Sequence, residues 1–311
     1  MNTKTFDIPI LLIAFNRPET TCHVLEQIRK IKPSKLYIFS DAARAENQEE
    51  AELVDLCRHL YSDSQINWLC QIERWYPETN MGKAIGVSSA ISWAFETSDR
   101  LIILEDDCLP SQSFFKFCKV MLEKYELNDQ IMHISGTRWT TDHKLVQRDH
   151  FFSRIGDTWG WATWKRAWNK YDFWMEHFPE MKHQKQIEKL FGDAEVAEYW
   201  HKKLDSAYQE QKKADWSQQW QYTLFQHKGL SAVPSVNLIS NIGIRKDDPL
   251  PAKDSYPFHE AKVWIDLKSD SNFAVDNSYE KHHLKRISVK KPPVRIRILK
   301  SFRSLFRGSA Q

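Results

Sequence analysis

The chain has 311 residues, 41% of them hydrophobic and 13% aromatic, which is enough to bury a core in one large domain or two small ones. No apolar run approaches the roughly 18 residues of a membrane span, and an acidic residue precedes any hydrophobic segment long enough for export, so we expect a cytoplasmic protein. The five cysteines are scattered without C-x-x-C spacing, which indicates neither a disulfide framework nor a zinc site.

Charge is distributed unevenly along the chain. The net charge is +3, but residues 281–311 hold ten Lys and Arg and no Asp or Glu, which leaves −7 for the preceding residues. Within this basic tail one helical face is apolar (Ile298, Leu299, Phe302, Leu305, Phe306) and the other is basic (Lys300, Arg303, Arg307). The pattern is typical of an amphipathic helix on an anionic membrane surface, with a helix docked on the domain or a disordered tail as alternatives. The net acidic body makes nucleic acid an unexpected partner.

The first 135 residues alternate short apolar runs with longer amphipathic stretches. The runs predicted to be strands cover residues 8–15, 35–41, 66–73, 100–106 and 131–135. The stretches predicted to be helices cover residues 18–31, 46–60, 82–96 and 113–125. Strands that alternate with helices predict βαβ units and an α/β fold with a mostly parallel, doubly wound sheet.

Beyond residue 136 the chain changes character, because tryptophan becomes frequent and the regular alternation ends. We expect helices over 184–213 and 215–227, an extended segment over 230–240, and a long polar loop over 244–280. The predicted organisation is one domain over 1–280, with halves at about 1–135 and 136–280, followed by the tail at 281–311.

Three of the predicted strands end in polar residues, in the segments FNRP, FSDAAR and LEDDC. In parallel sheets, ligands bind beyond the carboxyl ends of the strands. The third segment contains Glu105, Asp106 and Asp107, and alternation along an extended chain would point Glu105 and Asp107 one way and Asp106 the other.

Adjacent carboxylates repel one another and raise each other's pKa unless a positive charge lies among them. Mg²⁺ or Mn²⁺ would supply that charge, and a site with one or two protein carboxylates leaves positions open for phosphate oxygens. The alternative is an acidic turn that faces the N-terminus of the helix beginning near Ser111.

The sequence lacks the glycine-rich loops of other phosphate-binding proteins. It has no G-x-x-x-x-G-K-[ST], and no G-x-G-x-x-G follows the first strand, where AFNRPETT contains no glycine. This absence disfavours a nucleotidyltransferase or a dinucleotide-binding protein. The pattern is still compatible with a metal that bridges two phosphates. Such a metal makes a nucleoside diphosphate a good leaving group.

Seven segments in order resemble GT-A glycosyltransferases: IPILLIAFNRP, IFSD, LIILEDDCLPSQSFFKF, MHISG, FFSRIGDTWGWATWKRAW, DWSQQW and VPSVNLISNIGI. The likeness covers roughly residues 8–245 and is nearest to a bacterial group of nucleotide-diphospho-sugar transferase-like proteins, some labelled hemolytic protein. More distantly, the chain is similar to the inverting N-acetylglucosaminyltransferase that starts complex N-glycan branching. The resemblance implies a GT-A fold, with a Rossmann-like sheet flanked by helices and a helical, aromatic acceptor half.

The resemblance implies roles for the residues at the strand ends. Asp107 would bind the metal, Glu105 would lie near the donor sugar and Asp106 near the ribose. Arg17 and Asp41 would hold the nucleotide, with the Asp41 carboxylate suited to the N3 proton of uracil. The alternatives are a solvated turn residue at Arg17 and a helix cap at Asp41.

A second donor segment is implied by TNMGK, where Asn80, Gly82 and Lys83 occupy the loop before the third helix. A simple helix start is the alternative there. The preceding residues, ERWYPET, depart from the Arg-Asp-rich version found in the bacterial group.

Asp215 matches the position of the catalytic base in the family. It would take a proton from an acceptor hydroxyl while that oxygen attacks the anomeric carbon from the face opposite the diphosphate, which inverts the configuration. The alternative is that Asp215 caps the helix opening at Trp216, and both roles can coexist only if that helix start faces the cleft.

The aromatic segment DTWGWATW provides further acceptor-side residues. Trp159 and Trp161, together with Trp216, could offer faces on which a sugar stacks, while Gly160 would allow close approach; packing in the core is the alternative. His259, in the polar loop, is a second metal ligand in this hypothesis or a solvated residue.

The sequence thus predicts a metal-dependent, inverting glycosyltransferase that moves a sugar from a nucleotide donor, expected to be a UDP-sugar, to a hydroxyl of a glycan or lipid-linked glycan. The tail would bring it to the inner membrane face, and the loop at 244–280 would close over the donor. A non-catalytic carbohydrate-binding or membrane-associated protein on the same scaffold is the rival, and it would need neither Asp107 nor Asp215.

Overall fold

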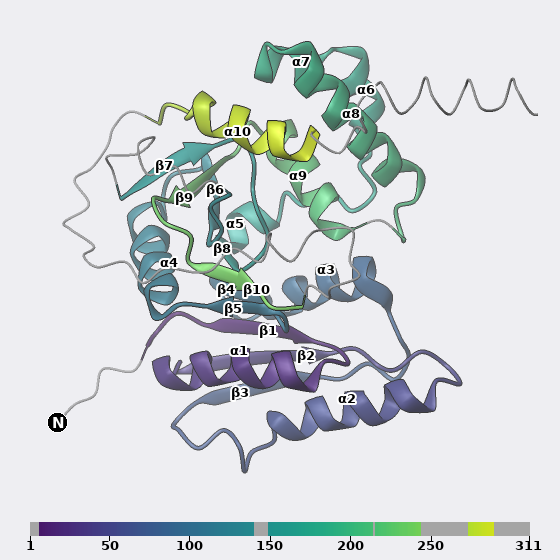
Figure 1. The fold of residues 1–311 in the computed structure, drawn as a ribbon, viewed down its shortest axis with the longest axis vertical. Helices are drawn as coiled ribbons and strands as arrows, with labels where there is room; N and C mark the ends of the chain where they lie inside the picture. The colour runs from purple at the N-terminus through teal and green to yellow at the C-terminus, as the bar shows by residue number, and fades with distance from the viewer. Residues whose placement is uncertain (1–5, 140–148, 214, 244–272, 289–311) are drawn as a thin grey trace, which may run out of the picture.

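The structure is a computed structural model, and it describes residues 6–139, 149–213, 215–243 and 273–288. Its centre is an eight-stranded sheet with the order β3-β2-β1-β4-β8-β6-β9-β7 (Figure 1). The strands are β1 (Ile10–Ala14), β2 (Lys35–Ser40), β3 (Gln71–Trp75), β4 (Arg100–Glu105), β6 (Ile131–Ser135), β7 (His150–Ser153), β8 (Trp161–Trp164) and β9 (Leu230–Pro234).

Four of the seven strand pairs are parallel: β2 with β3, β1 with β2, β1 with β4, and β6 with β9. The other pairs, β4 with β8, β6 with β8 and β7 with β9, are antiparallel. The predicted α/β fold class with a mostly parallel central sheet flanked by helices is confirmed.

The helices cover both faces of this sheet. They are α1 (Pro18–Ile31), α2 (Gln48–Leu60), α3 (Gly82–Ala94), α4 (Gln112–Lys124), α5 (Lys165–Trp168), α6 (Phe178–His183), α7 (Gln186–Phe191), α8 (Ala194–Gln209), α9 (Trp216–Gln226) and α10 (Asn277–Ser288). Helices α6, α7 and α8 gather at the end of the molecule farthest from α2 (Figure 1). They pack around a separate apolar cluster that includes Phe178, Ile187 and Trp200.

Strand β1 shows why the sheet strands are continuous apolar runs. Ile10, Leu12 and Ala14 pack in the core formed with α1, α2 and α4, while Leu11 and Ile13 pack in the core formed with α3 and α9. A parallel strand that is covered on both faces has no position for a polar side chain until it ends. The first polar positions after these strands therefore fall at the carboxyl edge of the sheet.

A second, two-stranded sheet crosses this edge. β5 (Cys108–Pro110) pairs antiparallel with β10 (Ile239–Asn241), with Ile239 opposite Pro110. The amide of Ile242 then donates to the backbone oxygen of Asp107 at 2.9 Å. The pairing holds residues 239–243 directly beside the acidic triplet.

The third strand differs from its predicted position. It was expected over residues 66–73, whereas β3 runs from Gln71 to Trp75 and is only partly buried. Ile66 and Trp68 pack on the core from the loop that precedes the strand. The apolar side chains of Ile66 and Trp68 therefore indicated a buried loop and not a strand. β3 itself has a mixed sequence because it is an edge strand and is only partly buried.

The helix expected over 184–213 is interrupted. Gly192, with φ of 65°, ends α7, and the side chain of Asp193 begins α8 by accepting hydrogen bonds from the amides of Glu195 and Val196 at 3.0 and 3.3 Å. A left-handed residue followed by a capping carboxylate separates two helices that share one periodic pattern.

The end of the predicted loop over 244–280 is helical, because α10 begins at Asn277. The expected boundary between domain and tail at 280 and 281 therefore falls inside a helix. Residues 244–272, with His259, and residues 289–311, with the amphipathic tail pattern, lie outside the described residues. Within the described part of the chain, no helix has the length and apolarity needed to span a membrane.

Candidate active site

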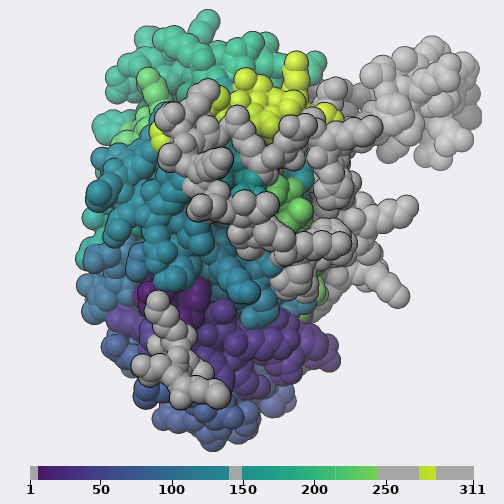
Figure 2. Space-filling view, turned by 90° about the vertical axis from the view of Figure 1, so that its left-hand side faces the viewer, coloured from purple at the N-terminus to yellow at the C-terminus, as the bar shows by residue number. Residues whose placement is uncertain are grey.

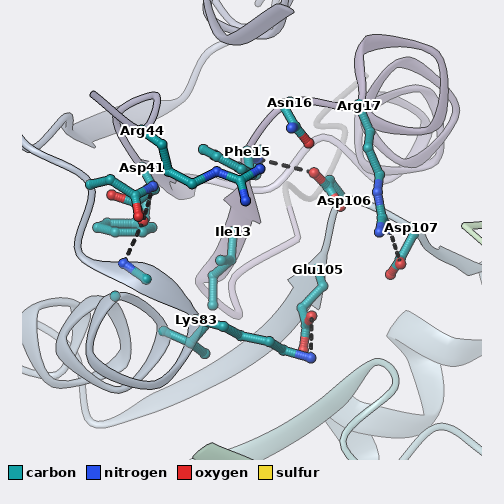
Figure 3. A pocket seen from close by; sticks show the side chains of 16 residues that line it. Ile13, Phe15, Asn16, Arg17, Asp41, Arg44, Lys83, Glu105, Asp106 and Asp107 are labelled. Carbon is teal, nitrogen blue, oxygen red and sulfur yellow. Dashed lines mark hydrogen bonds and ion pairs between the residues drawn. The ribbon is translucent and has the colours of Figure 1, made fainter. Parts of the chain in front are cut away.

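A pocket of about 330 Å³ lies at the carboxyl ends of β1, β2 and β4, beside the first turn of α3 (Figure 3). We call it the donor pocket. The residues that line it include six of those predicted from the sequence to bind the donor or its metal: Arg17, Asp41, Lys83, Glu105, Asp106 and Asp107. Asn80 and Gly82 of the predicted second donor segment line it as well. The parallel strands bring these residues together because their carboxyl ends meet at one edge.

The three carboxylates have three different partners. The predicted alternation does not continue past Glu105, because β4 ends there and Asp106 and Asp107 lie in a turn. Figure 3 shows Glu105 directed toward Lys83, Asp107 toward Arg17, and Asp106 toward the backbone of Phe15. None of these partners belongs to α4, whose first turn is capped by the Ser111 hydroxyl instead. The geometry therefore argues against an acidic turn that serves only to cap that helix.

Asp107 forms an ion pair with Arg17. The Nη1 group of Arg17 donates to Oδ2 of Asp107, and the thiol of Cys108 donates to Oδ1 at 3.5 Å. Pro18 helps to place Arg17, because the residue before a proline is restricted to extended conformations and here precedes the first residue of α1. Gly243 lies against the pair, where a Cβ atom would collide with both charged groups. The Asp107–Arg17 pair is thus enclosed on one side by the chain that follows β10.

Asp106 joins the end of β4 to the end of β1. Its Oδ2 atom accepts a hydrogen bond from the amide of Phe15 at 3.0 Å, and its side chain is buried. Burial, together with the charge of Asp107, raises the pKa of Asp106 to about 6, although the Phe15 amide and Arg17 oppose this effect. Keeping the Asp106 carboxylate ionised at this buried position costs free energy. A further positive charge in the pocket would reduce that cost.

Lys83 lies between Glu105 and Asp215. Its Nζ atom is 3.9 Å from Oε2 of Glu105 and 3.6 Å from Oδ2 of Asp215. Burial raises the pKa of Glu105 to about 7 despite this lysine, and the Glu105 charge, with that of Asp215, raises the pKa of Lys83. The ammonium group connects the donor pocket with the start of α9.

Asp215 caps α9, which is the alternative role considered from the sequence. Its side chain caps α9, because Oδ1 accepts a hydrogen bond from the amide of Ser217 at 3.2 Å. The same side chain remains 41% exposed and directs Oδ2 toward Lys83. Asp215 is not among the residues that line the donor pocket, but Lys83, which does line it, connects the pocket with the start of α9.

Asp41 is placed in the pocket but is already fully bonded. Oδ1 accepts from the amides of Ala42 and Met81, each at 2.9 Å, and Oδ2 accepts from the Gly82 amide at 3.1 Å and the Asn80 side chain at 3.2 Å. A carboxylate offers about four acceptor positions, so none is left for the N3 proton of uracil. The expected contact with the base is not available in this structure, and Asp41 instead holds the start of α3.

The expected acceptor-side tryptophans are mostly in the core. Trp161 and Trp216 are 0% and 1% exposed and stack on each other with ring centroids 5.6 Å apart, so neither offers a face to a ligand. Gly160, with φ of 59°, makes room for Ile239, and not for a sugar. Trp159 is only partly buried, with its ring 4.8 Å from that of Trp139, but it does not line the donor pocket. The prediction for both is wrong: Trp161 lies in β8, which is covered on both faces, and Trp216, at the start of α9, packs in the same core.

A polar cluster at the rim of the pocket was not predicted from the sequence. Asn16 and Arg44 line the pocket, and both donate to the buried carboxylate of Glu50. The Arg44 guanidinium lowers the pKa of Glu50 to about 2. Asn16 and Arg44 lie in the polar strand ends FNRP and FSDAAR, so their position carried a signal, whereas Glu50 is one of several acidic residues at a helix start.

Among the residues that the structure describes, no group of three or more His, Cys, Asp and Glu side chains is arranged to hold a metal ion. A metal here would have few protein ligands. Burial first, and then the neighbouring carboxylates, raise the pKa values of Glu105 and Asp106 although Lys83 and Arg17 oppose this effect, so a further positive charge would stabilise their ionised forms. A cation held by one carboxylate and by phosphate oxygens would fit this charge distribution.

No protein-family model matches the chain, and no curated protein sequence matches it. Solved structures with some similarity include mouse xyloside xylosyltransferase 1, with 14% identity, 73% of this chain and 84% of that chain covered, and a TM-score of 0.34. The 4-diphosphocytidyl-2C-methyl-D-erythritol synthase of Anaerococcus prevotii has 9% identity, coverage of 53% and 77%, and a TM-score of 0.33. The inositol-1-phosphate CTP transferase of T. maritima has 11% identity, coverage of 52% and 73%, and a TM-score of 0.31. At TM-scores this low the likeness carries no argument about activity, which has to be inferred from the donor pocket.

Proposed function

We propose that the chain is a GT-A-type glycosyltransferase that transfers a sugar from a nucleoside diphosphate donor, expected to be a UDP-sugar. The supporting observation is the convergence of Arg17, Lys83 and the carboxylates of residues 105–107 on one pocket at the carboxyl ends of β1, β2 and β4. This edge of a parallel sheet is where ligands bind in such folds. Two cations on either side of an acidic triplet suit a diphosphate and a metal better than a neutral ligand.

The two cations would hold the diphosphate. Arg17 presents a planar guanidinium, which matches the geometry of phosphate oxygens, and its side chain is 41% exposed. Lys83 is 58% exposed and lies 3.6 Å from Asp215 and 3.9 Å from Glu105. Both cations can turn toward phosphate oxygens, and a metal ion bound with the diphosphate would then compensate the charges of Asp107 and Glu105 in their place.

A divalent cation would be bound by Asp107, with phosphate oxygens as its other ligands. Mn²⁺ or Mg²⁺ supplies stabilisation of the charge that develops on the leaving diphosphate. Arg17 now compensates the charge of Asp107, and its release toward the phosphate would make that carboxylate available. Glu105 and Asp106 would contribute negative charge around the cation.

Asp215 is the proposed base. The proton of the acceptor hydroxyl would pass to its carboxylate while the acceptor oxygen forms a bond to the anomeric carbon. The bond from that carbon to the diphosphate oxygen breaks at the same time, and its electron pair leaves with the nucleoside diphosphate, so the configuration inverts. The Ser217 amide keeps Asp215 oriented, and Lys83, at 3.6 Å, is the group that a bound diphosphate would draw away from it.

The acceptor and the cellular location of the reaction are expectations from the sequence. We propose a hydroxyl of a glycan or lipid-linked glycan as the acceptor. The basic tail would bring the enzyme to an anionic membrane surface. The tail pattern lies outside the described residues, so binding to anionic vesicles by the full chain is its test.

Turnover by active-site variants tests the proposed function. Release of UDP from UDP-sugars in the presence of Mn²⁺ and a mixture of glycan acceptors should fall by about 10²-fold or more in Asp215→Asn, as expected for loss of a general base. Asp215→Asn should still bind the donor, whereas Asp107→Asn should lose metal-dependent donor binding. Wild-type protein that releases no UDP, and variants that bind carbohydrate as well as wild type, would instead identify a non-catalytic binding protein.

A further inference from the structure

A second pocket, of about 690 Å³, lies on a different face of α3 from the donor pocket. Aromatic rings from β3, α3 and the segment after α5 line it, and we call it the aromatic pocket: Trp75, Trp93, Tyr171, Phe173 and Trp174. Ser89, Ser92, Glu96 and Lys212 add polar groups to its wall. None of these residues has a role in the donor site.

Trp174 is unusual among the tryptophans of the described residues. Its side chain is 48% exposed, whereas each of the other described tryptophans is buried or partly buried. An exposed indole beside other aromatic rings leaves a large apolar surface in contact with water. Such patches on a single chain commonly mark a binding site.

The backbone of Trp174 is held by hydrogen bonds on both sides. Its amide donates to the Asp172 carboxylate at 3.0 Å, and its backbone oxygen accepts from the Gln211 side chain at 2.6 Å. Met175, the next residue, has a φ of 52°, a conformation that non-glycine residues rarely adopt, and it is fully buried. This turn places Met175 in the core and Trp174 outside it. Because the backbone is ordered in advance, less conformational freedom is lost when a ligand stacks on the ring.

The chemistry of the pocket matches a pyranose ring. The faces of a pyranose carry C–H groups that pack on aromatic rings, and its rim carries hydroxyls that exchange hydrogen bonds with polar side chains. Lys212, whose Nζ lies 5.9 Å from the centre of the Trp174 ring, and the exposed carboxylate of Glu96 offer a donor and an acceptor at that rim. A nucleobase would fit the rings but would leave most of these polar groups without partners.

The aromatic pocket is connected to the proposed base through two helices. Tyr171 Oη lies 3.2 Å from Oε1 of Gln219 in α9, and the Gln219 amide donates to the Phe173 backbone oxygen at 2.6 Å. Asp215 caps the same helix. On α3, Lys83 contacts Asp215, and the aromatic pocket extends along the helix to Ser92, which is roughly 14 Å from Lys83 along the helix axis.

We propose that the aromatic pocket binds a pyranose unit of an oligosaccharide acceptor, whose reacting hydroxyl lies at Asp215. A spacing of this size requires an acceptor of several sugar units. The assignment of the bound sugar as an acceptor rests on the proposed transferase function. The binding of a sugar ring to Trp174 does not depend on that function.

Fluorine NMR of the full chain labelled with 5-fluorotryptophan tests the binding directly. The Trp174 signal is identified by its loss in Trp174→Phe. Three β1,4-linked disaccharides, namely cellobiose, lactose and N,N′-diacetylchitobiose, are the probes, and mannitol, an acyclic polyol, and uridine are the controls. At least one disaccharide should shift the Trp174 signal saturably, and neither control should. The shift should persist in Asp215→Asn.

Calorimetric titration then measures the contribution of the ring. The disaccharide that binds should bind about tenfold more weakly to Trp174→Ala, equivalent to about 1.4 kcal/mol, and equally well to Leu127→Ala, which changes an exposed residue outside the pocket. No saturable shift with any disaccharide, an equal shift with mannitol or uridine, or unchanged affinity in Trp174→Ala would overturn the inference.

The two proposals can fail separately. Disaccharide binding at Trp174 without release of UDP from any UDP-sugar would remove the transferase function and the acceptor assignment but keep the sugar site. UDP release without disaccharide binding would keep the function and remove the sugar site.

Discussion

Glu105 carries the least favourable charge in the donor pocket. Burial raises its pKa to about 7 from an ordinary value of 4.5, although Lys83 lies 3.9 Å away. The folded state therefore holds a proton on Glu105 that the unfolded chain gives up between these two pH values. Stability from this group is present below pH 4.5 and is lost as the pH rises through about 7.

Replacement of Glu105 by glutamine removes this charge while nearly keeping the shape of the side chain. We expect Glu105→Gln to raise the free energy of unfolding by on the order of 2 kcal/mol at pH 8 and to change it little at pH 4. Urea denaturation of both proteins at the two pH values measures the difference. The same variant should bind a metal and diphosphate less well, because the charge is unfavourable only without the ligand. Equal stability of variant and wild type at both pH values would contradict the described charge distribution.

The residues of the site could be located from the sequence better than their partners could. Arg17 and the carboxylates at 105–107 come at or after the ends of buried strands, Lys83 lies in the first turn of a helix, and the parallel order of the strands brings them to one edge. The four hydrogen bonds of Asp41 could not be foreseen, because its partners lie at the start of α3 about forty residues later in the chain. Trp161 was misassigned because its periodic pattern does not reveal that β8 is covered on both faces.

At the scale of the elements, the start of α3 depends on Asp41. The helix has no capping side chain at its N-cap residue, Met81, so the Asp41 carboxylate satisfies the first amides from a neighbouring strand end. This arrangement also places Lys83 and Gly82 in the donor pocket. Asp41 is therefore a positioning residue for the proposed donor site.

Asp41→Ala should leave these amides without partners and lower the free energy of unfolding by about 2–3 kcal/mol, since each buried unsatisfied group costs about 1–3 kcal/mol. Asp63→Ala, at a carboxylate that is 87% exposed, is the control and should cost less than about 1 kcal/mol. Urea denaturation measures both. If Asp41→Ala changed the preference among nucleoside diphosphates and left stability unchanged, the base-reading role would be correct after all.

Long apolar runs predicted the elements reliably, and mixed sequences did not. β1, β2, β4 and β6 form within a residue or two of the predicted ranges because each is buried on both faces. β3 was displaced because an edge strand has no continuous apolar run. The pairing of β5 with β10 joins three-residue segments far apart in the sequence, and neither segment has a local pattern that would reveal it.

At the scale of the whole molecule, α10 belongs to the folded body. Figure 2 shows it against the surface formed by the preceding half of the chain. Glu280 is buried and accepts hydrogen bonds from the Ser153 hydroxyl at 3.1 Å, the Arg154 amide at 2.6 Å and Nη2 of Arg154 at 2.6 Å. The change from an acidic to a basic composition near residue 281 therefore does not mark where the fold ends.

Removal of the Glu280 carboxylate should destabilise the protein as a whole. Breaking a buried ion pair by removal of one partner costs about 3–5 kcal/mol, because the other charge stays buried. We expect Glu280→Ala to lose about 3 kcal/mol, and the exposed substitution Glu198→Ala to lose less than about 0.5 kcal/mol, in urea denaturation. Equal midpoints for the two variants would show that α10 is dispensable for the stability of the body.

In the proposed function, the acidic triplet shares a cation with a bound nucleoside diphosphate. The melting temperature of the wild type and of Asp107→Asn, with UDP, GDP, ADP and TDP and with or without Mn²⁺, tests it most directly. We expect UDP with Mn²⁺ to stabilise the wild type by about 2.7 kcal/mol at a concentration 100-fold above its Kd, UDP alone to stabilise it less, and the metal-dependent part to vanish in Asp107→Asn. No shift with any diphosphate, or a shift that is the same with and without Mn²⁺ in both proteins, would contradict the claim.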